Sequence, residues 1–365
     1  MRGKIIVGIS GGVDSAVSAW LLKQEGWQVE GLFMFNWAED ESGYCDAAED
    51  FQTARQVCAE LDIPLHRADF SQEYRQRVFQ QFLDEYAAGR TPNPDVLCNR
   101  EIKFRSFLEH ALRLGAEQVA TGHYAGVETH DGHSWLMQAA DRDKDQTYFL
   151  ALVPEEAFAR TRFPLWQLPK AQVRELARKA GLPNHARKDS TGICFIGERP
   201  MREFLSRYLP AQPGPIMSLD HPENGAYRLV GAHQGLVHYT PGQRRGVGLG
   251  GLRGAAEAPW YVVRKDMANN IMYVSQHHDH KELYSDSAGL GPMHWIGPPP
   301  AQAATLSVRV RHRQPLQACQ LEQQEGGWRL HFAEAQRAVV PGQYAVLYEG
   351  RRCLGGAVIE EGSGG

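Results

Sequence analysis

Short apolar runs alternate with helix-like segments over the first part of the chain. The runs that predict strands are residues 4–9, 28–35 and 64–70. The segments in which apolar residues recur at helical spacing are residues 13–25, 47–61 and 71–88. Because strands and helices follow one another regularly, the pattern predicts a parallel sheet with helices on both faces. Ligands of such sheets bind beyond the carboxyl ends of the strands.

The pattern changes along the rest of the chain. A further helix is expected over about 96–114, and a strand follows after Gly115. The pair Asp131-Gly132, between two alternating segments, indicates a hairpin attached to the first domain. After residue 282, short alternating runs recur and predict a small β-barrel.

The length of 365 residues allows two or three domains with substantial cores. The fold expected is α/β, with a Rossmann-like parallel sheet followed by a small mixed domain and a barrel. The corresponding domains are residues 1–205, 206–282 and 283–365. With 42% hydrophobic and 22% charged residues, the composition is that of a globular protein.

The charge and cysteine content exclude several classes of protein. Because the formal net charge is −4, binding of nucleic acid must depend on local basic patches such as Arg309, Arg311 and Arg313. Six cysteines without a Cys-x-x-Cys pair argue against a zinc site or a disulfide framework, and no metal ligands are expected. No apolar stretch reaches the roughly 18 residues of a membrane span, so we expect a cytoplasmic protein without membrane partners.

The segment GISGGVDS, residues 8–15, follows the first expected strand. Gly11 and Gly12 let backbone amides approach an anion, and the helix that begins near Val13 directs its positive end to the same place. Two serines add hydroxyl donors, whereas Asp14 suits a phosphate site if a magnesium ion lies between them. The glycines alone are equally compatible with a tight strand-to-helix turn.

The hexamer SGGVDS resembles the pyrophosphate loop of the PP-loop ATP pyrophosphatases. That resemblance implies an adenine nucleotide α-hydrolase-like domain that cuts ATP between its α and β phosphates and transfers AMP to an oxygen. It also accounts for the absence of a P-loop lysine, because the loop would hold the leaving pyrophosphate. The substrate stays open, since the superfamily includes small-molecule synthetases and tRNA-modifying enzymes.

A second candidate site lies in TPNPDVLCNREIKF, residues 91–104. Two X-Pro steps favour extended backbone, and we expect Asp95 to cap the helix that follows. Cys98 would then lie in the first turn, where the helix N-terminus and the nearby Arg100 and Lys103 favour the nucleophilic thiolate. Asp95 would alternatively transfer protons. A packed cysteine beside a capping aspartate is the plainer interpretation.

Cys194 lies in KDSTGICFIGER, a polar stretch that predicts an irregular loop. By itself it identifies no chemistry. Together with the two segments above, however, this stretch resembles the tRNA-specific 2-thiouridylase family. The other stretches that carry the resemblance are ATGHYA, KDQTYFL, PGQRRGVG and VRVRHRQP, and they follow in the same order over nearly the whole chain.

The resemblance implies thiolation at C2 of the wobble uridine, position 34, in tRNA(Lys), tRNA(Glu) and tRNA(Gln). ATP, accompanied by Mg²⁺, would adenylate the C2 oxygen, and a cysteine desulfurase or a sulfur-relay protein would donate persulfide sulfur. Cys194 would carry the persulfide, and Cys98 would be the nucleophile that forms a disulfide with it. Asp95 would be the acid/base. The persulfide either attacks C2 directly or yields hydrosulfide that does.

The family's ligand residues have counterparts at matching positions. Those that would hold ATP are Gly8, Ile9, Ser10, Gly11, Gly12, Val13, Asp14, Ser15, Met34 and Gly122. Those that would line the target base are Asn93, Pro94 and Asp95, and those that would contact tRNA are His123, Lys144, Asp145, Gln146, Arg311, His312 and Gln343. The family commonly has tyrosine where this chain has His312, and imidazole can also stack on RNA.

Two other interpretations are open. A small-molecule synthetase of the same superfamily would give no role to Cys98 and Cys194. A non-catalytic nucleotide- or RNA-binding protein on the same sheet would release no pyrophosphate. Release of pyrophosphate that depends on tRNA separates the three.

Overall fold

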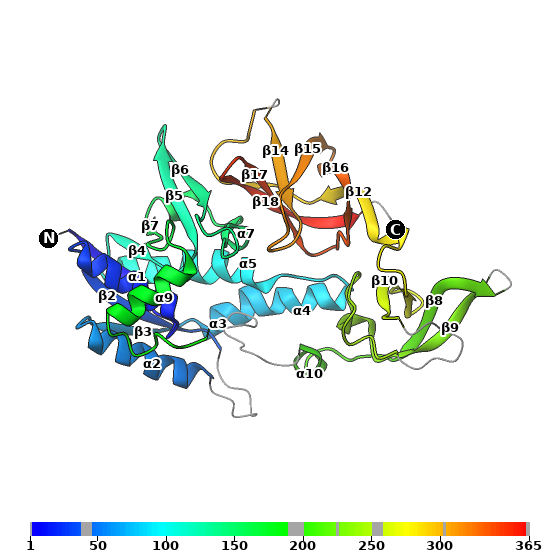
Figure 1. The fold of residues 1–365 in the computed structure, drawn as a ribbon, viewed down its shortest axis with the longest axis horizontal. Helices are drawn as coiled ribbons and strands as arrows, with labels where there is room; N and C mark the ends of the chain where they lie inside the picture. Colours follow the sequence, from blue (N-terminus) through cyan, green and yellow to red (C-terminus); the bar gives the residue numbers. More distant parts are fainter. Residues whose placement is uncertain are drawn as a thin grey trace.

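The structure is a computed structural model that describes residues 2–37, 46–188, 201–223, 226–249, 258–301 and 304–362. Cys194 lies outside the described residues. Figure 1 shows the N-terminal α/β part at one end of the molecule and a small sheet, β8 to β11, at the other, with the C-terminal strands above the helices between them.

The N-terminal part is built on a parallel sheet with strand order β3-β2-β1-β4-β7. Its strands are β1 (Lys4–Gly8), β2 (Gln28–Phe35), β3 (Leu65–Asp69), β4 (Gln118–Ala120) and β7 (Thr161–Arg162). Alternate residues of β1 face opposite sides: Ile5 and Val7 belong to one core cluster, and Ile6 belongs to the other. The expected parallel sheet with two covered faces is confirmed.

Helices cover both faces of this sheet. Those on the side of Ile5 include α1 (Val13–Gln24), α2 (Asp46–Glu60) and α9 (Lys170–Lys179), whose apolar residues share one cluster. The opposite side carries two long helices, each interrupted by a π-helical segment. They are α3 (Ser71–Tyr74), η1 (Arg75–Phe79) and α4 (Gln80–Ala87), then α5 (Pro94–Cys98), η2 (Asn99–Ser106) and α6 (Phe107–Arg113). Such π segments occur frequently at functional sites.

The expected hairpin is present as β5 (Ala125–His130) and β6 (His133–Gln138), and positive φ at Asp131 and Gly132 forms its turn. Its second strand also pairs with the C-terminal strand β18 (Arg352–Gly362), so that Leu136 lies opposite Cys353. The hairpin therefore extends the sheet of the C-terminal strands, although it lies between elements of the N-terminal part in the sequence. Nothing in its own sequence predicts this long-range pairing. Short helices α7 (Thr147–Leu150) and α8 (Glu155–Phe158) follow it.

The segment after α10 (Met201–Ser206) forms a four-stranded sheet with order β10-β11-β8-β9. Its elements are β8 (Gly214–Glu223), β9 (Ala226–His233), η3 (Leu236–His238), β10 (Tyr261–Asp266), β11 (Ile271–Ser275) and η4 (Lys281–Leu283). Ile216, Val262 and Val274 contribute to a core cluster of its own. That separate core supports the division at about residues 205 and 282, which stays a prediction.

The C-terminal strands form a barrel. In the described part of the chain the order is β12-β16-β15-β14-β17-β18, and pairing of β12 with β18 closes the sheet. The strands are β12 (Tyr284–Leu290), β13 (His294–Trp295), β14 (Leu306–Arg309), β15 (Gln317–Gln324), β16 (Gly327–Arg337), β17 (Tyr344–Glu349) and β18. Val308, Leu330, Leu347 and Ile359 fill the interior. The expected barrel is confirmed.

Candidate active site

The loop between β1 and α1 is held by its own hydroxyl groups. The Ser15 Oγ donates to the carbonyl oxygen of Gly12 at 3.0 Å and accepts from the backbone N–H of Ser10 at 3.2 Å. Gly11 has a φ of +80°, and Gly12 precedes the first turn of α1 in an extended conformation. The first amides of α1 therefore face the carboxyl end of β1, as an anion site requires.

Two residues distant in sequence lie against this loop. A Cβ atom on Gly122 would come within 2.7 Å of the backbone nitrogen of Ser15, so only glycine fits between β4 and α1. A Cβ atom on Gly8 would meet Met34 Cε at 3.3 Å. The structure thus brings together Gly8, Ser15, Met34 and Gly122, all of which were expected at one nucleotide site.

A lysine from another part of the chain reaches the loop. Lys170, the first residue of α9, places its Nζ 2.7 and 2.8 Å from the two carboxylate oxygens of Asp14. The hydroxyl of Tyr124 donates to the same carboxylate at 3.0 Å. The side chain of Lys170 is 11% exposed and that of Asp14 is 30% exposed, so this pair lies at the mouth of the loop rather than in the core.

An arginine and an asparagine also contact the loop. Asn184 donates from Nδ2 to the carbonyl oxygen of Gly11 at 2.8 Å, and the Arg187 guanidinium lies 3.4 Å from the same oxygen. Arg187 is paired with Asp50 of α2 at 2.5 Å. Sequence reasoning missed Lys170, Asn184 and Arg187, because each is an ordinary polar residue of a helix and the turn that follows it.

The segment expected to line the target base begins at a helix cap. Asn93, not Asp95, is the N-cap of α5: its side-chain oxygen accepts the backbone N–H of Asp95 at 3.2 Å. Pro94 occupies the first helical position, where the missing N–H costs nothing. The expectation that Asp95 caps the helix is therefore wrong, and the Asp95 side chain is not needed for capping.

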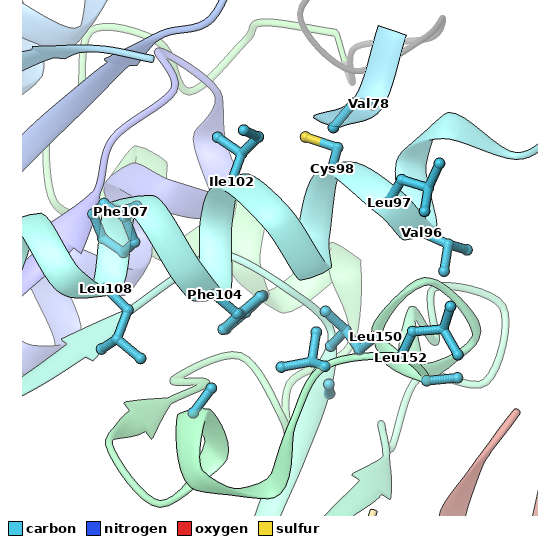
Figure 2. Close-up of a cluster of buried hydrophobic side chains, with 14 of the residues drawn as sticks. Val78, Val96, Leu97, Cys98, Ile102, Phe104, Phe107, Leu108, Leu150 and Leu152 are labelled. Carbon is cyan, nitrogen blue, oxygen red and sulfur yellow. The ribbon is translucent and has the colours of Figure 1, made fainter. Parts of the chain in front are cut away.

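Cys98 is the last residue of α5 and lies beyond the first helical turn. It is 0% exposed and belongs to the core cluster that includes Val78 of η1 and Ile102 of η2 (Figure 2). Arg100, expected to favour the thiolate, is paired with Glu101 at 2.8 Å. Chemistry at the Cys98 sulfur therefore requires movement of the side chains that cover it.

We expect Cys98 to be protected from alkylation in the resting protein. Iodoacetamide should modify it on the order of 10²-fold more slowly than in urea, because modification needs local opening. Peptide mass spectrometry measures the rate, with Cys58, 2% exposed, as an internal control. Adding tRNA and a non-hydrolysable ATP analogue should accelerate labelling of Cys98 only. Reaction at the unfolded rate in the resting protein would contradict this picture.

Apart from Gln343, whose Nε2 donates to the carbonyl oxygen of Thr91 at 2.7 Å, the residues expected to contact tRNA form two groups. Gln146 and Tyr124 exchange two hydrogen bonds of 2.9 Å, which places Lys144, Asp145 and Gln146 beside the segment that follows Gly122. His123 is buried between Thr121 and Lys103, and burial lowers its pKa well below the usual value. The imidazole is therefore neutral.

The Asp145 side chain is buried and forms hydrogen bonds within the protein. Its carboxylate, 0% exposed, accepts from Arg309 Nη1 at 2.8 Å, from Thr147 Oγ1 at 2.9 Å and from the Ala139 N–H at 3.0 Å. Arg309, which the sequence suggested as part of a surface patch, is 8% exposed. This ion pair instead joins the barrel to the N-terminal part of the molecule.

The other two arginines of the expected patch line a cavity of about 360 Å³ on the barrel. The lining residues are Val310, Arg311, His312, Arg313, Gln314 and Arg337. The His312 ring lies 4.3 Å from that of Phe149, between ring centroids, and burial lowers the pKa of His312 to about 4. Arg337 Nη2 is buried and meets no hydrogen-bond partner among the described residues. The cavity is therefore a basic pocket with an unsatisfied donor.

A parallel sheet with this loop, joined to a small sheet and a barrel, defines a multidomain PP-loop enzyme. Three family profiles match the chain in succession: the tRNA methyl transferase HUP domain over residues 3–198, the tRNA methyl transferase PRC-barrel domain over 202–276 and the Aminomethyltransferase beta-barrel domain over 285–359.

Curated proteins resemble the chain over nearly its whole length. It is 53% identical over 359 residues to tRNA-specific 2-thiouridylase MnmA of Hahella chejuensis, covering 98% of this chain and 97% of that protein. It is 50% identical over 364 residues to the protein of the same name from Legionella pneumophila, covering 99% of both. The chain belongs to the tRNA-specific 2-thiouridylase family and is a tRNA-uridine 2-sulfurtransferase, which confirms the expectation from the sequence.

Solved structures resemble the chain only distantly. One is a 4-thiouridine synthetase in complex with RNA and ATP, with 19% identity and a TM-score of 0.35 over 57% of this chain and 50% of that one. A likeness of this size bears on no functional argument. Within the described ranges, the helices are all too short or too polar to cross a membrane.

Proposed function

We propose that this enzyme uses ATP to thiolate C2 of uridine 34 in tRNA(Lys), tRNA(Glu) and tRNA(Gln), with sulfur from a cysteine desulfurase or a sulfur-relay protein. The observation that carries the proposal is the closeness of two cations to the loop at residues 8–15. Lys170 forms an ion pair with Asp14, and Arg187 contacts the carbonyl oxygen of Gly11. A loop without its own lysine thereby gains the positive charge that a polyphosphate needs.

Each of these cations is paired with a carboxylate in the structure. When ATP binds, its phosphates carry more charge than one carboxylate, so Lys170 and Arg187 would move from Asp14 and Asp50 to phosphate oxygens. Asp14 would then be available as an oxygen ligand for Mg²⁺, which proteins commonly hold through one or two carboxylates and the substrate phosphates. The ion would screen the phosphate charge.

Adenylation solves a leaving-group problem. The C2 oxygen of uridine cannot depart as oxide, so it attacks the α-phosphate and displaces pyrophosphate, which the loop amides and Lys170 would hold. Asp95 would move the proton at the base during attack. Asn93 and Pro94 would line the flipped base beside it.

Sulfur transfer then involves two thiols and consumes two electrons. In one route the terminal sulfur of the Cys194 persulfide attacks C2 and expels AMP. Cys98 next attacks the Cys194 sulfur, so the S–S bond to the uridine sulfur breaks and a Cys98–Cys194 disulfide forms. In the other route Cys98 first releases hydrosulfide, which then attacks C2. Both routes end with AMP, 2-thiouridine and a disulfide that an external thiol must reduce.

The basic pocket of the barrel suits a tRNA phosphate. Arg311, Arg313 and Arg337 surround it, and neutral His312 would stack or hydrogen-bond rather than act as a charge. Gln146 lies near this pocket, because its carbonyl oxygen accepts the backbone N–H of Phe149 at 3.0 Å and the Phe149 ring packs against His312. The two groups of expected contact residues would therefore meet one region of the RNA.

Pyrophosphate release with and without tRNA tests the proposed function. We expect release only with a tRNA that carries uridine 34, and none with a transcript in which cytidine replaces it. Incubation with a cysteine desulfurase and cysteine should add one sulfur atom to Cys194, read by peptide mass spectrometry. Release that ignores tRNA would indicate a small-molecule synthetase, and no release would indicate a binding protein.

Replacing Arg337 by alanine should weaken tRNA binding by removing one phosphate contact. We expect the slope of log affinity against log salt to become less steep by about 0.7 to 0.9. Filter binding at several salt concentrations measures the slope. Arg329→Ala is the matched control, because this arginine of the same strand is paired with Glu361 at 2.6 Å away from the pocket. An unchanged slope in Arg337→Ala would exclude the contact.

A further inference from the structure

The residues that lead into α5 are held by two other domains. We call residues 89–92 the entry segment, since it runs directly into Asn93, Pro94 and Asp95. From β10 of the central sheet, Lys265 Nζ donates to the carbonyl oxygen of Gly89 at 2.7 Å. From the loop that follows η3, the Thr240 hydroxyl lies 3.1 Å from that of Thr91. These contacts join positions more than 140 residues apart, with separations of 176 and 149 residues.

The barrel also forms hydrogen bonds with the entry segment. The Thr91 N–H donates to the carbonyl oxygen of Pro341 at 2.9 Å, and Gln343 Nε2 donates to the Thr91 carbonyl oxygen at 2.7 Å. Gly342 between them has a φ of +90°, and a Cβ atom there would come within 2.9 Å of the Thr91 nitrogen. The barrel backbone therefore lies directly on the segment, at a distance that no other residue permits.

Lys265 is an unusual partner for such a contact. Its side chain is half-buried between the domains, and burial lowers the pKa of Lys265 to about 8. Among the described residues no carboxylate forms an ion pair with it, and its hydrogen bond goes to a backbone carbonyl. Burying an ammonium group costs free energy unless hydrogen bonds offset it. A methionine would fill the same space without that cost, so packing does not explain the lysine.

We propose that Lys265 is a positioning residue for thiolation: together with Gln343 it fixes the entry segment, and thereby sets where Asn93 and Asp95 meet the uridine. The inference rests on the proposed function, in which Asp95 acts on the flipped base. Because Gln343 donates through its nitrogen to Thr91, its oxygen can still accept a hydrogen bond from tRNA. The central domain and the barrel would thus fix the position of α5 relative to the bound RNA.

Lys265→Met tests the inference in the full-length enzyme under single-turnover conditions with saturating tRNA and ATP. We expect the thiolation rate to fall on the order of 10- to 10²-fold, because a displacement of about 1 Å at a reacting group costs this much. The affinity for tRNA and the KM for ATP should stay within about twofold, since Lys265 bonds to Gly89 and lines neither the basic pocket nor the loop at residues 8–15. Hydrogen exchange of residues 89–98 should accelerate.

Lys265→Arg should restore most of the rate, because it keeps a donor on a long stem. Lys281→Met, at an exposed lysine of η4, is the matched control and should match the wild type. A wild-type rate in Lys265→Met overturns the inference, and so does a loss that appears wholly in tRNA affinity. If the wild-type enzyme itself fails to thiolate uridine 34, the proposed function fails, whereas faster exchange of residues 89–98 in Lys265→Met still reports the restraint.

Discussion

Replacing Lys170 by methionine should reduce kcat/KM for ATP on the order of 10²-fold or more. The variant loses a cation from the loop and leaves Asp14 uncompensated, so that a carboxylate faces the incoming phosphates. Pyrophosphate release measures the effect on chemistry. Affinity for inorganic pyrophosphate, measured by calorimetry, should fall as well and does not depend on turnover.

Lys179→Met is the matched control for this prediction. Lys179 lies on the same helix, is paired with Glu175 at 2.7 Å and is largely exposed. We expect its kinetics and pyrophosphate affinity to match the wild type. Lys170→Arg should give an intermediate result, since guanidinium keeps the charge with a different shape. If pyrophosphate binds Lys170→Met as tightly as the wild type, Lys170 is a structural partner of Asp14 and no more.

Replacing Asp95 by asparagine should reduce the thiolation rate between about 10²- and 10⁴-fold, the range ascribed to a general acid/base. The melting temperature should change little, because Asn93 supplies the cap of α5 and asparagine conserves the size of the side chain. Single-turnover formation of 2-thiouridine, read by mass spectrometry of digested tRNA, gives the rate.

Asn93→Ala separates stability from chemistry in the same helix. Loss of a cap costs about 0.5 to 2 kcal/mol of unfolding free energy, so this variant should melt at a lower temperature. Comparing the two variants shows whether the Asn93 carboxamide or the Asp95 carboxylate contributes to stability. A fully active Asp95→Asn variant would remove Asp95 from the mechanism.

The hydrophobic pattern predicts local elements well because apolar residues recur at a different spacing in strands and in helices. The parallel sheet follows from alternating runs such as residues 4–9 and 13–25, whose cores form within the N-terminal part. The pairing of β6 with β18 could not be foreseen, since strand sequences carry no record of which distant partner completes the sheet. The π segments were missed for a similar reason: their apolar spacing differs little from that of an α-helix.

Residues of a contiguous motif can be recognised from the sequence, whereas residues that reach the site from elsewhere in the chain cannot. The loop at residues 8–15 is recognisable because its glycines and serines are contiguous, whereas Lys170 and Arg187 reach it from a distant helix and turn. Arg309 looked like Arg311 and Arg313 in an alternating run, yet it points inward to Asp145. A continuous strand would place all three arginines on one face, but β14 ends at Arg309, and Arg311 and Arg313 lie in the turn that follows.

The pairing of the hairpin strand β6 with the C-terminal strand β18 affects how the chain can be made. Gln138 of β6 hydrogen-bonds with Arg351, which is 213 residues further along the chain. At a synthesis speed of about 5 to 20 residues per second, a ribosome needs on the order of 10 to 40 s to supply that partner. During this interval the outer edge of β6 is open to pairing with other polypeptides, and a nascent chain must be shielded there. The yield of folded enzyme should accordingly fall when chaperones are scarce during synthesis.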